Sequence, residues 1–251
     1  MAGGGHDSGA VFGPRAEHYH QNRLSLPDDA VRWLVPAKCR SVAEIGAGTG
    51  LFTGQLAARL DGEPPEIVAI EPDEKMRRVL AVNCPEVDVR AGTAEVLPVP
   101  DAHLDGLFGV AMWHWVEPAA ALAEAARVLA PGGILGVGWN ARAASELWLP
   151  EIDEIIASAH TAGHEPGRFH LTGESPFTTP EREVFPYECK MTADQVVALL
   201  STYSGVLAQS ADDRVEILGT ARKHLLAIAG DVEMLRVPFE AVCYRTYRQP
   251  S

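Results

Sequence analysis

Nearly continuous apolar runs alternate along the chain with segments in which apolar residues recur every three or four positions. Short continuous runs are typical of strands buried on both faces of a parallel sheet, whereas the wider spacing is typical of helices. The runs lie at 42–45, 67–70, 107–110 and 134–140, with a shorter alternating stretch at 87–89. The helical patterns lie at 51–60, 74–80 and 118–129. This alternation predicts an α/β fold with helices on both faces of a mostly parallel sheet.

The pattern changes in the last third of the chain. Residues 184–189 predict a strand, and Pro186 places it at an edge of the sheet because proline cannot donate a ladder hydrogen bond. Thr192 and Gln195 have the spacing of a capping box and predict the start of a helix. A longer amphipathic helix follows, and alternation over 239–244 predicts a final strand.

Length and composition fit one domain. With 251 residues, of which 47% are hydrophobic and 22% charged, the chain has room for one α/β unit but not for two full domains. We expect a flexible N-terminal tail at 1–13 and a single domain at 14–251. Two short helical stretches at 14–36 form an N-terminal cap, and an insertion at 141–181 interrupts the alternation.

Charge and cysteine content narrow the expected partners. The net charge is −13 and the basic residues do not cluster, so nucleic acid is not expected as a partner. No apolar run reaches the roughly 18 residues of a membrane helix, so no membrane contact is expected. Scattered cysteines favour reduced thiols in a cytoplasmic protein. The histidines at 160–170 lack ligand spacing, so no metal is expected.

The stretch Glu44–Gly50 combines the end of a strand, three glycines and the start of a helix. Glycines at such a turn let the backbone approach a ligand, and a helix N-terminus offers unpaired N–H groups. Leu51 stands where a dinucleotide fingerprint has its third glycine, which argues against a dehydrogenase. The plain alternative is a glycine-rich turn that binds nothing.

This stretch resembles the glycine-rich loop of class I S-adenosylmethionine-dependent methyltransferases of the small-molecule type. A helix closing at 129–133 with Leu-x-Pro-Gly-Gly is also similar to the family. The resemblance implies a Rossmann-like, doubly wound sheet of seven strands in the order 3-2-1-4-5-7-6, with the last strand antiparallel and a helical lid at 141–181. It also implies S-adenosyl-L-methionine as the cofactor.

Glu71 ends the second expected strand, where an acid can accept both ribose hydroxyls of an adenosine moiety. Thr93 stands where relatives commonly have an aspartate that binds the adenine amino group, and its hydroxyl is a weaker acceptor. The cofactor-binding residues that the pattern and the resemblance imply are Tyr19, Arg23, Glu44, Gly46, Ala47, Gly48, Thr49, Gly50, Glu71, Pro72, Met76, Thr93, Ala94, Glu95 and Ala111.

Tyr19 and Arg23 are four positions apart and therefore share one face of an expected helix. Many small-molecule methyltransferases have a similar Tyr-x-x-x-Arg before the first strand, and there the guanidinium would meet the cofactor carboxylate. A surface arginine beside a packed tyrosine explains the same spacing equally well.

Trp113, His114 and Trp115 leave the fourth expected strand at the edge where parallel sheets bind ligands. His114 is the candidate general base. The two indoles are candidates for holding an apolar or aromatic acceptor, and Asn140 at the end of the fifth strand is a further acceptor contact. Packing of a helix onto the sheet explains the three consecutive residues equally well.

The favoured function is transfer of a methyl group from S-adenosylmethionine to a small organic molecule. The motif (Asn/Asp)-Pro-Pro-(Tyr/Phe) of adenine and glutamine methylation is missing after the fourth strand, which argues against those acceptors. Two alternatives stay open: a cofactor-binding regulatory or partner module without transfer activity, and an NAD(P)-dependent oxidoreductase. The sequence sets neither the acceptor nor the oligomeric state.

Overall fold

A computed structural model describes residues 15–60, 66–143, 152–154, 168–171 and 175–250. The tail predicted at 1–13 lies outside this part. Most of the lid predicted at 141–181 also lies outside it, and within the described part of the lid residues 152–154 are helical.

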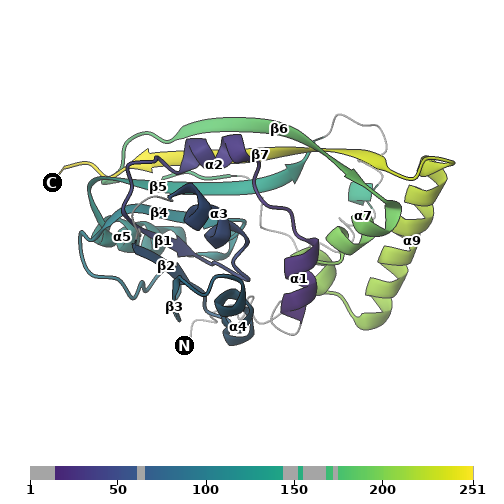
Figure 1. The fold of residues 1–251 in the computed structure, drawn as a ribbon, viewed down its shortest axis with the longest axis horizontal. Coiled ribbons are helices and arrows are strands. Elements are labelled where there is room, and N and C mark those ends of the chain that lie inside the picture. The colour runs from purple at the N-terminus through teal and green to yellow at the C-terminus, as the bar shows by residue number, and fades with distance from the viewer. Residues whose placement is uncertain (1–14, 61–65, 144–151, 155–167, 172–174, 251) are drawn as a thin grey trace.

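Seven strands form one mixed sheet in the order β3-β2-β1-β4-β5-β7-β6 (Figure 1). The strands are β1 (Ser41–Ile45), β2 (Glu66–Ile70), β3 (Asp88–Arg90), β4 (Leu104–Val110), β5 (Leu129–Arg142), β6 (Glu181–Met191) and β7 (Leu235–Tyr247). Neighbours among β1 to β5 pair in parallel, whereas β7 is antiparallel to both β5 and β6. The predicted strand order and the antiparallel last strand are confirmed, and Pro186 does lie in an edge strand.

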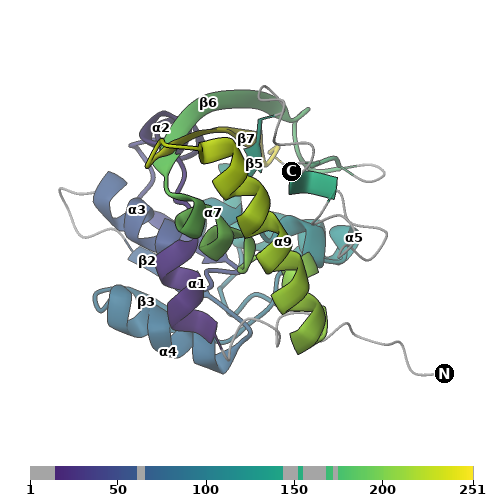
Figure 2. The same ribbon diagram turned by 90° about the vertical axis from the view of Figure 1, so that its right-hand side faces the viewer.

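Helices cover both faces of this sheet (Figures 1 and 2). They are α1 (Ala16–Asn22), α2 (Asp28–Leu34), α3 (Leu51–Arg59), α4 (Glu74–Asn83), α5 (Pro118–Val128), α7 (Ala193–Leu200), α8 (Ser204–Leu207) and α9 (Ala211–Ala229), with a 3₁₀ turn at Trp113–Trp115. Among the residues described, none of the helices has the length and apolarity that crossing a membrane requires.

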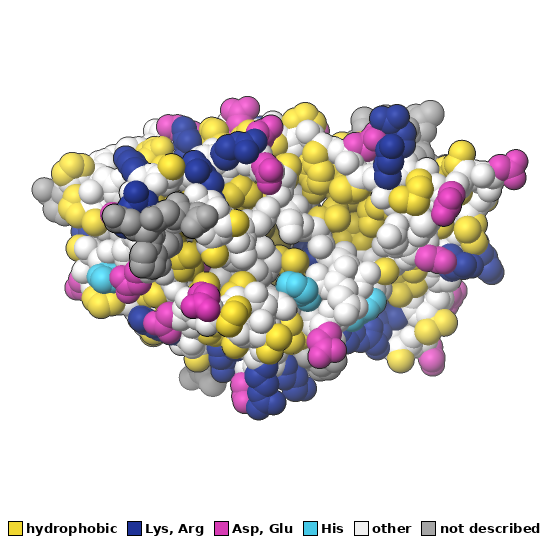
Figure 3. Space-filling view, in the orientation of Figure 1, with side chains coloured by type: hydrophobic (Ala, Val, Ile, Leu, Met, Phe, Trp, Pro, Cys, Tyr) yellow, Lys and Arg dark blue, Asp and Glu magenta, His cyan; other side chains and the backbone are white. Residues whose placement is uncertain are grey.

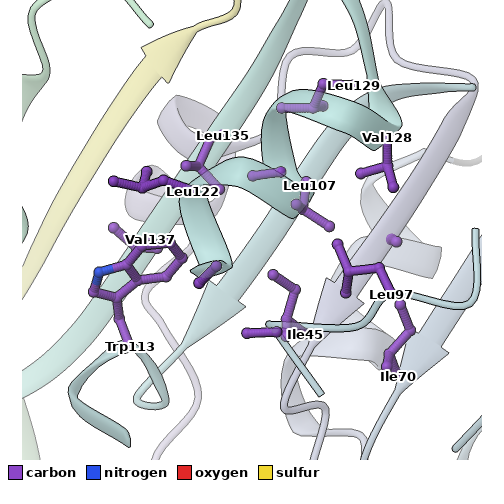
Figure 4. Close-up of a cluster of buried hydrophobic side chains, with 14 of the residues drawn as sticks. Ile45, Ile70, Leu97, Leu107, Trp113, Leu122, Val128, Leu129, Leu135 and Val137 are labelled. Atoms are coloured by element: carbon purple, nitrogen blue, oxygen red, sulfur yellow. The ribbon is translucent and has the colours of Figure 1, made fainter. Parts of the chain in front are cut away.

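Burial on two faces explains why the central strands are continuously apolar. Successive side chains of a strand point to opposite faces. Phe108 of β4 accordingly packs into a cluster with Leu34 of α2 and Phe52 of α3. Its neighbour Leu107 packs into the opposite cluster with Leu122 of α5 (Figure 4).

The C-terminal helices form a separate layer at one end of the sheet. β6 and β7 extend past the other strands, and α7 and α9 pack there (Figure 1). The predicted capping box starts α7: the Gln195 amide N–H donates to Thr192 Oγ1 at 3.1 Å, and Thr192 N–H donates to Gln195 Oε1 at 2.8 Å. Leu199 of α7 and Phe239 of β7 share this core and also reach the pocket described below.

The start of β5 differs from the sequence expectation. The Pro-Gly-Gly segment at 131–133 predicted a stop between helix and strand, but β5 already begins at Leu129. Leu129 pairs with Leu104 of β4, and the register then shifts before Ile134 pairs with Gly106. The strand thus tolerates the segment as an irregularity, with Gly132 at a φ of 80°.

Candidate active site

A pocket lies at the carboxyl ends of β1, β4 and β5, where an open parallel sheet is expected to bind ligands. One side consists of the loop at 46–49 after β1, together with Glu44 and with Ala111 after β4. The other side comes from residues far apart in the sequence: Tyr19, Arg23, Leu24, Asn140, Leu199, Tyr203 and Phe239. The fold therefore brings most of the predicted residues of the N-terminal segment, the glycine loop and β5 to one place.

The glycine loop requires glycine for two reasons. Gly46, Gly48 and Gly50 all have left-handed backbones, with φ values of 62°, 57° and 91°. A Cβ at Gly46 would lie 2.8 Å from Met112 Cβ, and one at Gly50 would lie 2.6 Å from Leu80 Cδ1. A Cβ at Gly48 would have only Gly46 O within 4.0 Å. The loop is thus packed from below at its two ends and open at its centre, as a cradle for a ligand must be.

Glu44 lies beneath this loop as a buried carboxyl group. Only 2% of its surface is exposed, and Thr53 Oγ1 of α3 donates a hydrogen bond to Glu44 Oε2 at 2.5 Å. Burial raises the pKa of Glu44 to about 8, and nearby Glu71 adds to the rise while the Thr53 hydrogen bond opposes it. Because Glu44 lines the pocket, a cationic ligand group there would favour its ionised form.

The Glu71 carboxylate bridges the glycine loop after β1 and the turn after β2. Its Oε2 accepts the Gly48 N–H at 2.8 Å, and its Oε1 accepts the Asp73 N–H at 2.9 Å. Burial raises the pKa of Glu71, and both backbone hydrogen bonds oppose that rise. Glu71 is only 7% exposed and is not among the residues that line the pocket. In the free protein this acid therefore orients the centre of the glycine loop.

The remaining residues predicted on the adenosine side lie around these two loops. Pro72 is exposed, whereas Met76 is buried and its backbone N–H donates to the side chain of Asp73, the N-cap of α4. Ala94 is 3% exposed, and Glu95 Oε1 accepts the Glu117 N–H at 2.9 Å. Thr93 is exposed and bridges to Val96. Like Gly50, these residues are not among those lining the pocket, so their contact with the cofactor stays a prediction.

Tyr19 and Arg23 both reach the pocket. The Arg23 guanidinium carbon lies 5.3 Å from the centre of the Tyr19 ring and 5.1 Å from that of Tyr203. Within the described part of the chain no carboxylate forms an ion pair with Arg23. The rings of Tyr19 and Tyr203 thus contact the Arg23 cation, and an anionic group of a ligand would be its counter-ion. Tyr203 was not predicted, because no motif in the sequence marks the turn after α7.

Side-chain hydrogen bonds fasten α1 across the pocket, between α4 and α7 (Figures 1 and 2). On one side His20 Nδ1 lies 3.0 Å from Thr49 Oγ1, and Asn83 Nδ2 donates to Thr49 O at 2.9 Å. On the other side His18 Nε2 lies 2.8 Å from Ser201 Oγ. Tyr19, which lies between the two histidines in the sequence, is thereby held over the glycine loop.

The Trp113–Trp115 turn lies beside the pocket, and none of its residues is among the lining residues. Trp113 is 5% exposed and packs edge-on against Phe169, with ring centres 5.1 Å apart. The Trp139 indole N–H donates to His114 Nδ1 at 3.3 Å. A neutral His114 in this arrangement carries its proton on Nε2. Trp115 is 38% exposed. The proposed roles of these residues toward an acceptor stay predictions.

Asn140 holds a fixed orientation in the pocket wall. Its Nδ2 donates to Leu24 O at 2.9 Å and to Ser25 O at 3.2 Å. Both partners are carbonyl acceptors, so the amide cannot turn over without losing both bonds. Its Oδ1 is buried and has no hydrogen-bond partner within the described part of the protein. A buried acceptor without a donor is costly, which makes Oδ1 a position for a ligand donor.

Comparison with known proteins agrees with this geometry. Residues 43–137 match the family model described as a methyltransferase domain. An uncharacterized methyltransferase of Mycobacterium tuberculosis is 35% identical over 243 residues, covering 95% of this chain and 96% of the relative. Another from Schizosaccharomyces pombe is 27% identical over 206 residues, covering 79% and 80%. The solved structure of a putative type II methyltransferase from Anaeromyxobacter dehalogenans has a TM-score of 0.73 at 23% identity, covering 91% of this chain and 99% of that one.

The chain belongs to the class I S-adenosylmethionine-dependent methyltransferases. S-adenosylmethionine is therefore its cofactor and methyl donor. A structure of Haemonchus contortus phosphoethanolamine N-methyltransferase 2 with S-adenosyl-L-methionine has the same fold, with a TM-score of 0.53 at 14% identity, covering 97% of this chain and 57% of that one. The left-handed glycines, the open centre of the loop and the buried acid beneath it all suit such a cofactor.

Proposed function

We propose that this methyltransferase acts on a small organic molecule that binds between the cofactor and the wall formed by Leu24, Asn140, Leu199, Tyr203 and Phe239. The observation that carries the proposal is the position of this wall. It lines the same pocket as the glycine loop, and hydrogen bonds from His18 and His20 hold α1 between Ser201 and Thr49, so the site suits a small molecule that fits inside the pocket. On the face in Figure 3 acidic and basic side chains are interspersed, which also favours a small acceptor over a polyanion.

The cofactor supplies an electrophilic methyl group on a positively charged sulfur. The chain's own contribution is to hold the donor and the acceptor in line and to exclude water. In this proposal Glu44 faces the cofactor ammonium, Arg23 pairs with its carboxylate, and Glu71 binds the ribose hydroxyls after yielding its present contacts in part. Gly46, Gly48 and Ala111 offer backbone groups along the same edge.

Two experiments test the function. In calorimetric titrations we expect S-adenosylmethionine and S-adenosylhomocysteine to bind, and NAD and NADP not to bind. Binding of a nicotinamide cofactor alone would contradict the proposal and favour an oxidoreductase. A screen with methyl-labelled donor should then transfer label to one class of small molecules. Cofactor binding with no transfer to any acceptor would favour a regulatory or partner module.

Arg23→Leu should lower the affinity for S-adenosylmethionine at least tenfold. A hydrogen bond to a charged group contributes about 1.5–3 kcal/mol, and about 1.4 kcal/mol corresponds to a factor of ten. 5′-Methylthioadenosine has no carboxylate, so it should bind the variant and the unchanged protein equally. Arg182→Leu is the matched control, because Arg182 lies over the Tyr244 ring on β6, away from the pocket lining. If Arg23→Leu changed the affinity for both ligands by the same factor, or left S-adenosylmethionine binding unchanged, Arg23 would not pair with the carboxylate.

His114→Ala should lower turnover by roughly 10²–10⁴-fold if His114 removes a proton from the acceptor. Cofactor affinity should stay nearly unchanged. Trp139→Phe is the informative companion, because it removes the indole N–H that engages His114 Nδ1 and keeps a ring in the core. Normal turnover of His114→Ala with a lowered melting temperature would assign the residue to packing alone.

A further inference from the structure

The charged groups that line the pocket are unevenly distributed. Among the described lining residues only Arg23 and Glu44 belong to the charged types, arginine, lysine, aspartate and glutamate. The methionine part of the cofactor carries one carboxylate and one ammonium group, which match these two residues one for one. The residues that line the wall opposite the glycine loop therefore have no charge left for the acceptor. Behind the wall, the Arg142 guanidinium carbon lies 5.2 Å from the centre of the Tyr203 ring, and Arg142 is paired with Asp153.

The rest of that wall is uncharged, with the apolar side chains of Leu24, Leu199 and Phe239 beside the phenols of Tyr19 and Tyr203. Leu199 and Phe239 are 2% and 1% exposed. Behind them Tyr187 stacks on Phe239, with ring centres 5.5 Å apart and planes inclined by 24°. A charged acceptor group placed here would lose its hydration without gaining a counter-charge, which is strongly unfavourable. A neutral, largely apolar molecule would meet these side chains without that cost.

One polar atom on this wall calls for a specific partner. Asn140 Oδ1 can only accept a hydrogen bond, because Leu24 O and Ser25 O already fix the NH₂ group of the same amide. An aliphatic amine would reach it as an ammonium ion, for which the wall offers no carboxylate. A hydroxyl group supplies one donor without a charge.

We propose that the methyl acceptor is a neutral alcohol or phenol whose apolar body lies against Leu199 and Phe239 and whose hydroxyl donates to Asn140 Oδ1. This inference rests on the proposed function. On transfer the hydroxyl oxygen forms the new C–O bond and the C–S bond breaks with its electron pair left on sulfur. The hydroxyl proton leaves for solvent, by way of His114 where that residue acts as the base. Asn140 is then a specificity-determining residue for the acceptor.

Three probes of one shape test the charge preference: benzyl alcohol, benzylamine and benzoate. Each is titrated into the protein saturated with S-adenosylhomocysteine and followed by ligand-observed NMR. We expect benzyl alcohol to bind at least tenfold more tightly than either charged probe at pH 7. Equal or tighter binding of benzylamine or benzoate overturns the inference. Failure of S-adenosylhomocysteine itself to bind would instead count against the proposed function.

Substitution of Asn140 tests the contact. Asn140→Ala should weaken benzyl alcohol at least threefold and leave toluene, which has no hydroxyl, unchanged. Asn22→Ala is the matched control, since Asn22 also donates to a backbone carbonyl, His18 O at 2.8 Å, but does not line the pocket. Melting temperature and S-adenosylhomocysteine affinity verify that each variant is folded. Equal loss of benzyl alcohol and toluene would show that Asn140 only shapes the wall, and the hydroxyl assignment would be wrong.

Discussion

Glu44→Gln is expected to raise the melting temperature of the cofactor-free protein at pH 8 and, at the same pH, to weaken S-adenosylmethionine binding. The two effects have opposite signs because the same carboxylate is costly in the empty pocket and useful in the occupied one. A glutamine keeps the size of the side chain and can still accept the Thr53 hydrogen bond. It removes only the charge.

The stability effect follows from proton linkage. Burial raises the pKa of Glu44 from 4.5 to about 8, so the folded protein binds this proton more tightly than the unfolded chain does. The stability that comes from protonated Glu44 is therefore fully present below about pH 4.5 and is lost as the pH rises through about 8. Since each pKa unit corresponds to about 1.4 kcal/mol, the loss is on the order of several kcal/mol. Glu44→Gln should remove this part of the pH dependence.

The binding effect has the opposite pH dependence. An ionised Glu44 attracts the cationic end of the cofactor, so affinity of the unchanged protein should rise between pH 6.5 and 9. Affinity of Glu44→Gln should be flat over this range and about tenfold or more lower at its alkaline end. Thermal melts and calorimetric titrations across the pH range give both quantities. Glu86→Gln, at an exposed position, is the control that should change neither. A variant that loses stability and keeps its affinity would contradict the assignment of Glu44 to the cofactor.

Sequence patterns predicted the sheet because the physical signal is local. The continuous runs at 42–45 and 107–110 are apolar since both faces of β1 and β4 are covered. The glycine turn after β1 is equally local, because a left-handed backbone at Gly46 or Gly50 leaves little choice of residue. The start of β5 was missed for the same reason: Pro-Gly-Gly is a strong local stop signal, and only pairing of Leu129 with Leu104 overrides it.

The opposite wall of the pocket could not be predicted in this way. Tyr203 and Phe239 meet Arg23 only because α7 and β7 pack together in the C-terminal core. No spacing in the sequence links residues so far apart. The unpartnered Oδ1 of Asn140 is likewise a property of the folded chain, since it depends on where the carbonyl groups of Leu24 and Ser25 lie.

Glu71 shows a finer limit of sequence reading. Its position at the end of β2 predicts contact with ribose hydroxyls, a role that stays a prediction. No sequence pattern predicts the hydrogen bonds that its carboxylate accepts from the Gly48 and Asp73 N–H groups. The residue is thus expected to act on the cofactor in two ways, directly and by orienting the loop.

Glu71→Ala should therefore lower both cofactor affinity and stability. Loss of two hydrogen bonds to a charged acceptor should reduce S-adenosylmethionine affinity at least tenfold. The freed N–H groups of Gly48 and Asp73 should lower the melting temperature, by an amount corresponding to roughly 1–3 kcal/mol if they stay buried and unpaired. Glu71→Gln keeps one acceptor oxygen. Its cofactor affinity and its melting temperature should lie between those of Glu71→Ala and those of the unchanged protein.

Asp73→Ala separates the two effects. Asp73 Oδ1 caps α4 by accepting the N–H groups of Lys75 and Met76 at 2.8 and 2.9 Å, so its loss should cost about 0.5–2 kcal/mol of stability. The backbone N–H that meets Glu71 remains, and cofactor affinity should change less than threefold. If Glu71→Ala lost stability to the same degree as Asp73→Ala and bound the cofactor as well as the unchanged protein, Glu71 would be only a brace between two loops. A tenfold loss of affinity in Glu71→Ala but not in Asp73→Ala would assign Glu71 to the cofactor. Asp73→Ala, destabilised to the same degree but with its affinity kept, would show that a loosened fold alone does not weaken binding.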